Sequence, residues 1–247
     1  MYHTPVPKAL SKTQEKLQLS LFQPAPSVPS ETADPVLLKF RRVLIGIIPD
    51  PALSLVLNWF SVHKVSLLIT RGRSSKSGDF RPPRNGSPPR ISINRTLNEY
   101  AFLITLLHEM AHYYLFEEQS RRSPLKRRKR VPPHGERWKE EFRQLITPYL
   151  IPEIFPAAIL EALQLHLKNP RASTHSDPHL ARVLLHFDPA PEGILMEKLP
   201  EGGLFTTTSG MLFRKEEKLR KRYRCQRLKD RKMYLFSPLA RVFPVDT

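Results

Sequence analysis

The sequence has one cysteine, few acidic residues for its size and no long apolar run. Cys225 has no partner for a disulfide within the chain and cannot by itself make a cysteine-based zinc site, so any metal must be held by histidines and carboxylates. No apolar run approaches ~18 residues, and the first thirty residues lack the unbroken apolar stretch of a signal peptide. These absences predict a cytoplasmic protein without a membrane span, which could associate with the nucleoid.

Basic residues dominate the charge. The 40 Lys and Arg outnumber the 23 Asp and Glu and leave a net charge of +17, far more than solubility requires. This balance predicts a polyanionic partner, and nucleic acid is the leading candidate. An acidic membrane surface could use the same charge, but the chain lacks an apolar segment to insert into it.

Changes in composition divide the 247 residues into four parts, enough for one main domain and a small appendage. Residues 1–33 are rich in proline and poor in apolar side chains, which predicts a disordered tail. Residues 34–168 are expected to form an α+β domain, residues 169–198 a linker, and residues 199–247, where the apolar period shortens to two, a small β appendage. The expected helices include 34–47, 53–60, 135–150 and 156–167, and the expected strands are 65–70, 90–94, 203–208, 211–213, 223–227 and 234–236.

One further helix is expected at the centre of the main domain. Thr96 and Glu99 have the spacing of a capping box, and the segment from Ala101 to about Glu117 is apolar nearly all round. A helix without a polar face has to be surrounded by other elements. Residues 119–133, which follow it, are expected to form a basic loop.

The central helix carries the motif His108-Glu109-Met110-Ala111-His112. Histidines four residues apart lie on one face of a helix, about one turn from each other, where both can bind a single ion. Glu109 lies at the neighbouring angle, close enough to bond a metal-bound water without ligating the metal. Polar side chains in an otherwise apolar helix are costly to bury without a partner, which favours a metal site over two histidines of the core.

A catalytic zinc needs a third protein ligand and one open position for water. The longer metalloprotease motif would place a histidine at position 118, which is Glu118 here. His134 is the preferred ligand, because it opens the next expected helix and precedes Trp138, which can pack against the motif helix. Glu136 or Glu140 of that helix is the alternative, although zinc's preference for imidazole favours His134.

Three segments together resemble a known family. They are Ile91-Ser92-Ile93-Asn94, then Leu106-Leu107-His108-Glu109-Met110-Ala111-His112, then His134-Gly135 with Trp138. The combination is similar to the SprT-like domain, a zinc peptidase domain also found in the eukaryotic protease Spartan, over about residues 36–150. The resemblance implies a minimal zincin fold with one catalytic Zn²⁺ held by His108, His112 and His134, and Glu109 as general base. It also implies action on proteins bound or cross-linked to DNA, and so a role in DNA–protein crosslink repair.

The chain departs from that family's pattern in the β appendage. Many relatives carry a zinc ribbon after the peptidase domain, whereas the corresponding segment here has only Cys225, with Leu228 where a second cysteine is expected. We therefore expect a ribbon-like unit that keeps its strands without a metal. The peptidase site does not depend on that metal.

Two basic segments are candidates for binding DNA without sequence preference, single-stranded DNA included. One lies between the second and third metal ligands, and the other lies on the β appendage beside Tyr223, which could stack on a base. The candidate residues are Arg121, Arg122, Lys126, Arg127, Arg128, Lys129, Arg130, Arg220, Lys221, Arg222 and Arg224. The competing hypothesis is a nucleic-acid-binding protein whose zinc is structural and which cleaves nothing. A structural site usually closes its fourth position with a protein side chain, and it has no use for Glu109.

Overall fold

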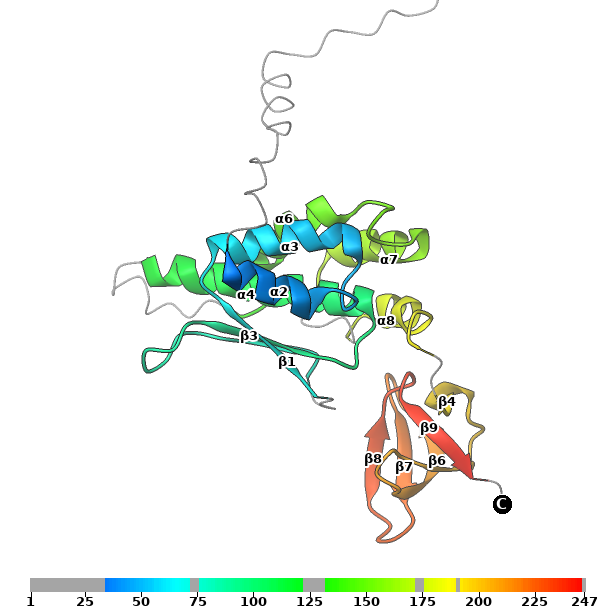
Figure 1. The fold of residues 1–247 in the computed structure, drawn as a ribbon. Coiled ribbons are helices and arrows are strands. Elements are labelled where there is room, and N and C mark those ends of the chain that lie inside the picture. The colour runs from blue at the N-terminus through cyan, green and yellow to red at the C-terminus, as the bar shows by residue number, and fades with distance from the viewer. Residues whose placement is uncertain (1–33, 72–75, 122–131, 172–175, 190–191, 246–247) are drawn as a thin grey trace, which may run out of the picture.

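The protein contains a helical part with a small sheet, followed by the β appendage (Figure 1). The structure is a computed structural model that describes residues 34–71, 76–121, 132–171, 176–189 and 192–245. The predicted tail at 1–33 lies outside the described residues, and so do residues 122–131 of the basic loop predicted at 119–133. The predicted α+β class is confirmed by the helices and two sheets of the described chain.

The helical part follows the predicted order of elements, with two additions. Its elements are α2 (Pro35–Leu44), α3 (Asp50–Val62), β1 (Ser66–Thr70), β2 (Gly78–Arg81), β3 (Arg90–Asn94), α4 (Glu99–Arg121), α6 (Glu136–Ile146), the short 3-10 helix η1 (Thr147–Tyr149), α7 (Ala157–Lys168) and α8 (Pro178–Leu185). The additions are β2 and α8. β2 lies in the connection between the two predicted strands, for which the sequence predicted no element.

The three strands of the helical part form a mixed sheet in the order β1-β3-β2. β1 runs parallel to β3, and β2 pairs antiparallel with β3, so that Gly78 lies opposite Ile93. Figure 1 shows the helices on one face of this sheet. β2 is therefore an edge strand, and it lies beside α4, with which it makes close contacts.

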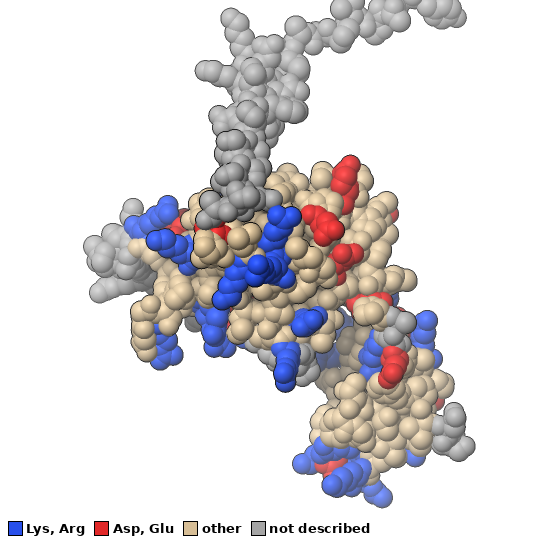
Figure 2. Space-filling model, in the orientation of Figure 1, with Lys and Arg blue, Asp and Glu red and all other residues tan. Residues whose placement is uncertain are grey.

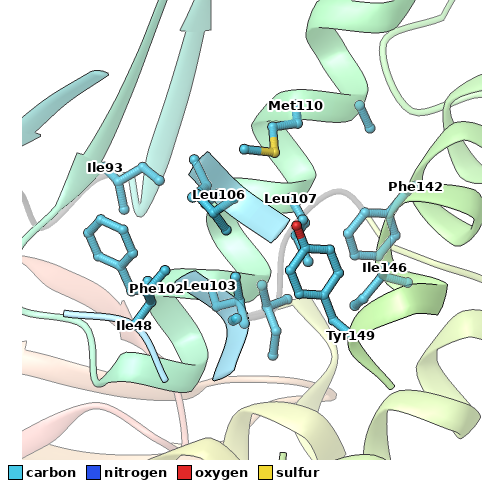
Figure 3. Packing of buried hydrophobic residues seen from close by; sticks show 14 of the residues in the cluster. Ile48, Ile93, Phe102, Leu103, Leu106, Leu107, Met110, Phe142, Ile146 and Tyr149 are labelled. Carbon is cyan, nitrogen blue, oxygen red and sulfur yellow. The ribbon is translucent and has the colours of Figure 1, made fainter. Parts of the chain in front are cut away.

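Helix α4 runs through the middle of the core, as its apolar composition predicted. Phe102, Leu103, Leu106, Leu107 and Met110 are all fully buried. Figure 3 shows them between the sheet and the α6 helix with the turn that follows it. Each such side chain contributes roughly 1.5–3 kcal/mol by leaving water, so this one helix supplies much of the stability of the domain.

The start of α4 differs from the predicted capping box. The helix begins at Glu99, and the cap is Asn98, whose Oδ1 accepts a hydrogen bond from Ala101 N at 2.9 Å. The Asn98 amide also donates to Leu184 O at 2.8 Å and to Asp188 Oδ1 at 2.7 Å. Asn98 thus caps the helix through its oxygen and is held in place through its nitrogen by two residues far away in the sequence. The far end of α4 reaches Arg121, so residues 119–121 are helical rather than part of a loop.

Residues 169–198, expected to be a linker, contribute ordered elements to both cores. Asp177 caps α8 by accepting from His179 N at 3.1 Å and Leu180 N at 3.4 Å, and it bonds the buried ring of His166 at 2.8 Å. Leu180 and Leu184 belong to the core around α4. At the other end of the stretch, β4 pairs with the last strand of the β appendage.

The β appendage is a six-stranded sheet in the order β4-β9-β5-β6-β7-β8. Its elements are β4 (Ile194–Leu195), the 3-10 helix η3 (Met196–Lys198), β5 (Leu204–Thr206), β6 (Leu212–Lys218), β7 (Tyr223–Arg227), β8 (Met233–Phe236) and β9 (Arg241–Val245). The four predicted strands are confirmed as β5 to β8, and β4 and β9 are added to them. The buried side chains of this unit, which include Phe205 and Phe213, form a second hydrophobic core.

A buried lysine connects η3 to the sheet of the β appendage. Lys215 Nζ donates to Met196 O at 2.8 Å and to Leu199 O, and it lies 4.0 Å from the centre of the Tyr223 ring. Burying a charge requires such partners. Cys225, its cross-strand neighbour, is fully buried, and burial raises the pKa of its thiol to about 11. The thiol is therefore unreactive at neutral pH. No helix in the described part of the chain has the length and apolar character needed to cross a membrane.

Candidate metal centre

Three histidines from two separate segments meet at one point beside α4. His108 and His112 come from α4, and His134 comes from the residues just before α6. Their Nε2 atoms lie 3.2 Å apart for His108 and His112, 3.2 Å for His108 and His134, and 3.0 Å for His112 and His134. The three could hold a metal ion, and among the described residues they are the group of donors that converges in this way.

The spacing of the three nitrogens fits a tetrahedral metal ion. Ligand nitrogens bound at about 2.0–2.1 Å in a tetrahedral arrangement lie roughly 3.3–3.4 Å from one another. The observed separations of 3.0–3.2 Å are close to that value. Neutral imidazoles brought this close without a cation would oppose lone pairs or crowd N–H groups, so the arrangement favours an ion between them.

The third donor of the converging group is a histidine and not a carboxylate. Gly135 is the N-cap of α6, which places His134 at the start of that helix and facing α4. The alternative ligands lie elsewhere, since Glu136 is exposed and pairs with Lys139, and Glu140 accepts from Gln144 at the surface. The preference for His134 over the two carboxylates therefore agrees with the geometry.

Trp138 supports all three rings. It is fully buried, and its ring centre lies 4.5 Å from that of His108, 4.9 Å from that of His134 and 5.6 Å from that of His112. Its ring also stacks on that of Phe142, with the ring centres 5.1 Å apart. The predicted packing of Trp138 against the motif helix is confirmed, and it restricts the rotamers of the histidines.

Burial keeps the three imidazoles neutral, which is the form that binds metal. Desolvation lowers the pKa of His108 well below its usual value, and the other two imidazoles add to the effect. The pKa of His112 falls to about 4, mainly through desolvation and also through His134, while Asp79 opposes the shift. Desolvation also lowers the pKa of His134. At neutral pH all three lone pairs are available to an ion.

Glu109 lies beside the triad, between α4 and the edge strand. Its side chain is buried, with 6% of the residue exposed, and its carboxylate approaches the backbone of β2 at Gly78. It does not belong to the converging group of donors. This is the position expected for a carboxylate that acts on a water molecule near the metal without binding the metal itself.

A cleft of about 1310 Å³ contains the triad and Glu109. The helical part contributes residues 76–80 of the β2 segment and residues of α4 to its lining, and the β appendage contributes Lys218, Arg220, Lys221, Arg222 and residues 237–240. Seven lining residues are Lys or Arg and three are Asp or Glu. The basic ones are Lys76, Arg171, Arg182, Lys218, Arg220, Lys221 and Arg222, so the cleft favours an anionic occupant.

The candidate DNA-binding residues are distributed unevenly about this cleft. Arg220, Lys221 and Arg222 line it, whereas Arg224 pairs with Glu217 at 2.8 Å outside the group of lining residues. Arg121 pairs with Glu117 at 2.9 Å at the end of α4, and the others, Arg122, Lys126, Arg127, Arg128, Lys129 and Arg130, lie outside the described residues. Among the candidate residues that the structure describes, only Arg220, Lys221 and Arg222 line the cleft that contains the metal centre.

Tyr223, expected to stack on a base, has one face of its ring covered by the Lys215 ammonium. That face is not available to a base. On the side of the molecule drawn in Figure 2, basic side chains lie on both parts and gather at the end of the β appendage far from the helices, near the β7–β8 connection.

Arg171 and Arg182 were not predicted to lie in the site. Arg171 donates to Ser176 O at 2.7 Å, and Arg182 pairs with Glu197 of η3 at 2.7 Å. Both lie in the stretch expected to be a linker, and Arg182 belongs to α8, which packs on the core around α4. In the sequence, only the positive charge of these two residues could have indicated that they belong to the site.

Comparison of the chain with protein-family models, with curated proteins and with solved structures found no match in any of the three.

Proposed function

We propose that this chain is a zinc-dependent metallopeptidase of the SprT-like type, with a minimal zincin domain that acts on proteins bound or cross-linked to DNA. The observation that carries the proposal is the convergence of His108, His112 and His134 beside the buried carboxylate of Glu109. Zinc is the metal that such a set of neutral imidazoles at tetrahedral spacing suits best.

The residues of the chain divide the chemistry between them. A bound zinc ion supplies a Lewis acid that lowers the pKa of water toward about 7 and polarises a peptide carbonyl. His108, His112 and His134 hold that ion and remain neutral through burial. Glu109 accepts the proton of the attacking water and then delivers it to the leaving amine. The buried setting of Glu109 limits its contact with bulk water during this transfer.

A catalytic role fits the surroundings of the triad better than a structural one. A structural zinc site is closed by four protein ligands, whereas a catalytic site keeps one position open. Within the described residues three donors converge, and they line a cleft large enough to admit an extended peptide. If the zinc were only structural, the buried carboxylate of Glu109 beside the triad would have no role.

The charge of the cleft supports DNA as the partner that brings substrates to the site. Arg220, Lys221 and Arg222 lie in the connection between β6 and β7 and line the same cleft as the triad. Contacts of this kind bind phosphates without reading base sequence, and they weaken as salt rises. A protein attached to the bound DNA would then lie within reach of the metal centre.

The test is cleavage of a DNA-binding protein by the full, zinc-loaded chain, with no DNA, with single-stranded DNA and with duplex DNA. We expect DNA to stimulate cleavage, and increasing salt to remove the stimulation before it removes zinc. Equal rates with and without DNA would leave a peptidase but refute the role of DNA. If DNA is bound and nothing is cleaved, the alternative of a nucleic-acid-binding protein with a structural zinc is correct.

A further inference from the structure

Gly78, the first residue of β2, stands where the edge strand comes closest to Glu109. Its φ is outside the left-handed region that favours glycine, since the described glycines with positive φ are Gly46, Gly86, Gly193, Gly202 and Gly210. Its backbone conformation is therefore open to any residue. The reason for a glycine at this position has to be space.

The available space is very small. A Cβ atom at position 78 would lie 2.7 Å from Glu109 Oε1, 2.7 Å from Thr105 Cγ2 and 3.0 Å from Glu109 Cγ. Non-bonded heavy atoms normally rest at about 3.5–4.0 Å, so a methyl group here would require a displacement on the order of 0.5–1 Å. The missing side chain lets the strand backbone lie directly against the carboxylate.

The groups around such a methyl group, which are the β2 backbone, Thr105 and Glu109, differ in how easily they can move. The backbone of β2 is held in its ladder with β3, and Asn94 N donates to Ser77 O at 2.8 Å next to Gly78. Thr105 is β-branched, buried and bonded through its hydroxyl to Ala101 O at 2.7 Å. Glu109 presents the end of a flexible side chain, so its carboxylate is the group that would be displaced.

We propose that Gly78 is a positioning residue for Glu109: by leaving out a side chain it lets the edge strand form a wall that holds the Glu109 carboxylate beside the metal centre. The inference rests on the proposed function, in which Glu109 is the general base. A displacement of less than 1 Å at a general base can lower the rate by about 10- to 100-fold, because proton transfer requires hydrogen-bond geometry. Gly78 itself takes no part in the chemistry.

The experiment compares Gly78→Ala with the same change in a Thr105→Ser background. Serine keeps the hydroxyl that bonds Ala101 O and removes the methyl group that Cβ would meet, so the structural part of the clash is relieved and the contact with Glu109 remains. We expect both Gly78→Ala proteins to keep zinc content and KM and to lose about 10- to 100-fold in kcat. Full recovery of kcat in the Thr105→Ser background would overturn the proposal, because the damage would then come from Thr105.

A second arm measures coupling between positions 78 and 109 without any activity. In metal-free protein with Thr105→Ser, the loss of Tm caused by Gly78→Ala should be smaller when Glu109 is also changed to Ala, which removes the atoms that the new methyl group would meet. Equal losses in the two backgrounds would show no contact and would overturn the proposal. If Glu109→Gln keeps full activity, the proposed function fails, whereas full activity of Gly78→Ala beside an inactive Glu109→Gln refutes only the role of Gly78.

Discussion

Acid should destabilise the metal-free protein through the buried histidines. In the unfolded chain a histidine titrates near its ordinary pKa of about 6.5, while folded His112 stays neutral down to about 4. Between these values the unfolded state binds more protons, so the free energy of unfolding falls as pH falls through this window. The two pKa values differ by about 2.5 units, which corresponds to about 3 kcal/mol at the acid end. His108 and His134, whose pKa values are also lowered, change stability in the same direction.

The assay is urea unfolding of chelator-treated protein at pH 7 and pH 5, followed by circular dichroism. For His112 alone we expect the free energy of unfolding to fall by about 2 kcal/mol between these pH values. His112→Gln is the matched control, because its side chain does not titrate, and its loss should be smaller. Equal losses in the parent and in His112→Gln would refute the burial of a neutral His112. Added zinc should restore stability at pH 7 more than at pH 5, because protons compete with the ion for the same nitrogens.

Three further changes have definite expected results. His134→Ala should weaken zinc binding by a hundredfold or more, which is on the order of 3 kcal/mol for the loss of one ligand. Glu140→Ala should leave the zinc affinity unchanged, and both affinities are measured by competition with a chelator. The reverse result would make the Glu140 carboxylate the third ligand. Replacing residues 220–222 by Ser should lower the slope of log affinity for DNA against log salt by about 2–3. The same slope, measured after residues 126–130 are replaced by Ser, tells whether that segment also binds DNA. If both variants keep the slope of the parent, DNA binding through these two segments is contradicted. Asn98→Ala should lower the free energy of unfolding by about 2–3 kcal/mol in urea titrations, since a helix cap and the partner of a buried carbonyl are lost together, and a change below about 0.5 kcal/mol would contradict this role.

Local patterns in the sequence were sufficient to predict α4 and the three histidines that could hold a metal ion. The central part of the helix is apolar nearly all round, and its burial follows from that composition. His108 and His112 are fixed relative to each other by helical spacing. His134 required an argument from residue type and from its place before a helix, and the convergence of its Nε2 atom with the other two agrees with that argument.

The missed elements depend on contacts between distant segments. β2 has four residues, begins with a glycine and shows no alternation of apolar side chains, so its pairing with β3 is what makes it a strand. α8 is an eight-residue helix in a stretch of ambiguous composition, and it is defined by the Asp177 cap and by its packing on the core. The cleft brings β2, α8 and the β6–β7 connection together, and no local pattern contains that arrangement.

The central claim is that the three histidines hold zinc and that Glu109 performs the proton transfer, and the most direct test combines two measurements on one pair of proteins. Zinc per chain and the rate of protein cleavage are determined for the parent and for Glu109→Gln, whose amide keeps the shape of the side chain but cannot accept a proton. The account predicts one zinc per chain in both proteins and a rate lower by about 10²- to 10⁴-fold in the variant. Equal cleavage by the two proteins, or the absence of zinc from a correctly folded parent, would contradict it.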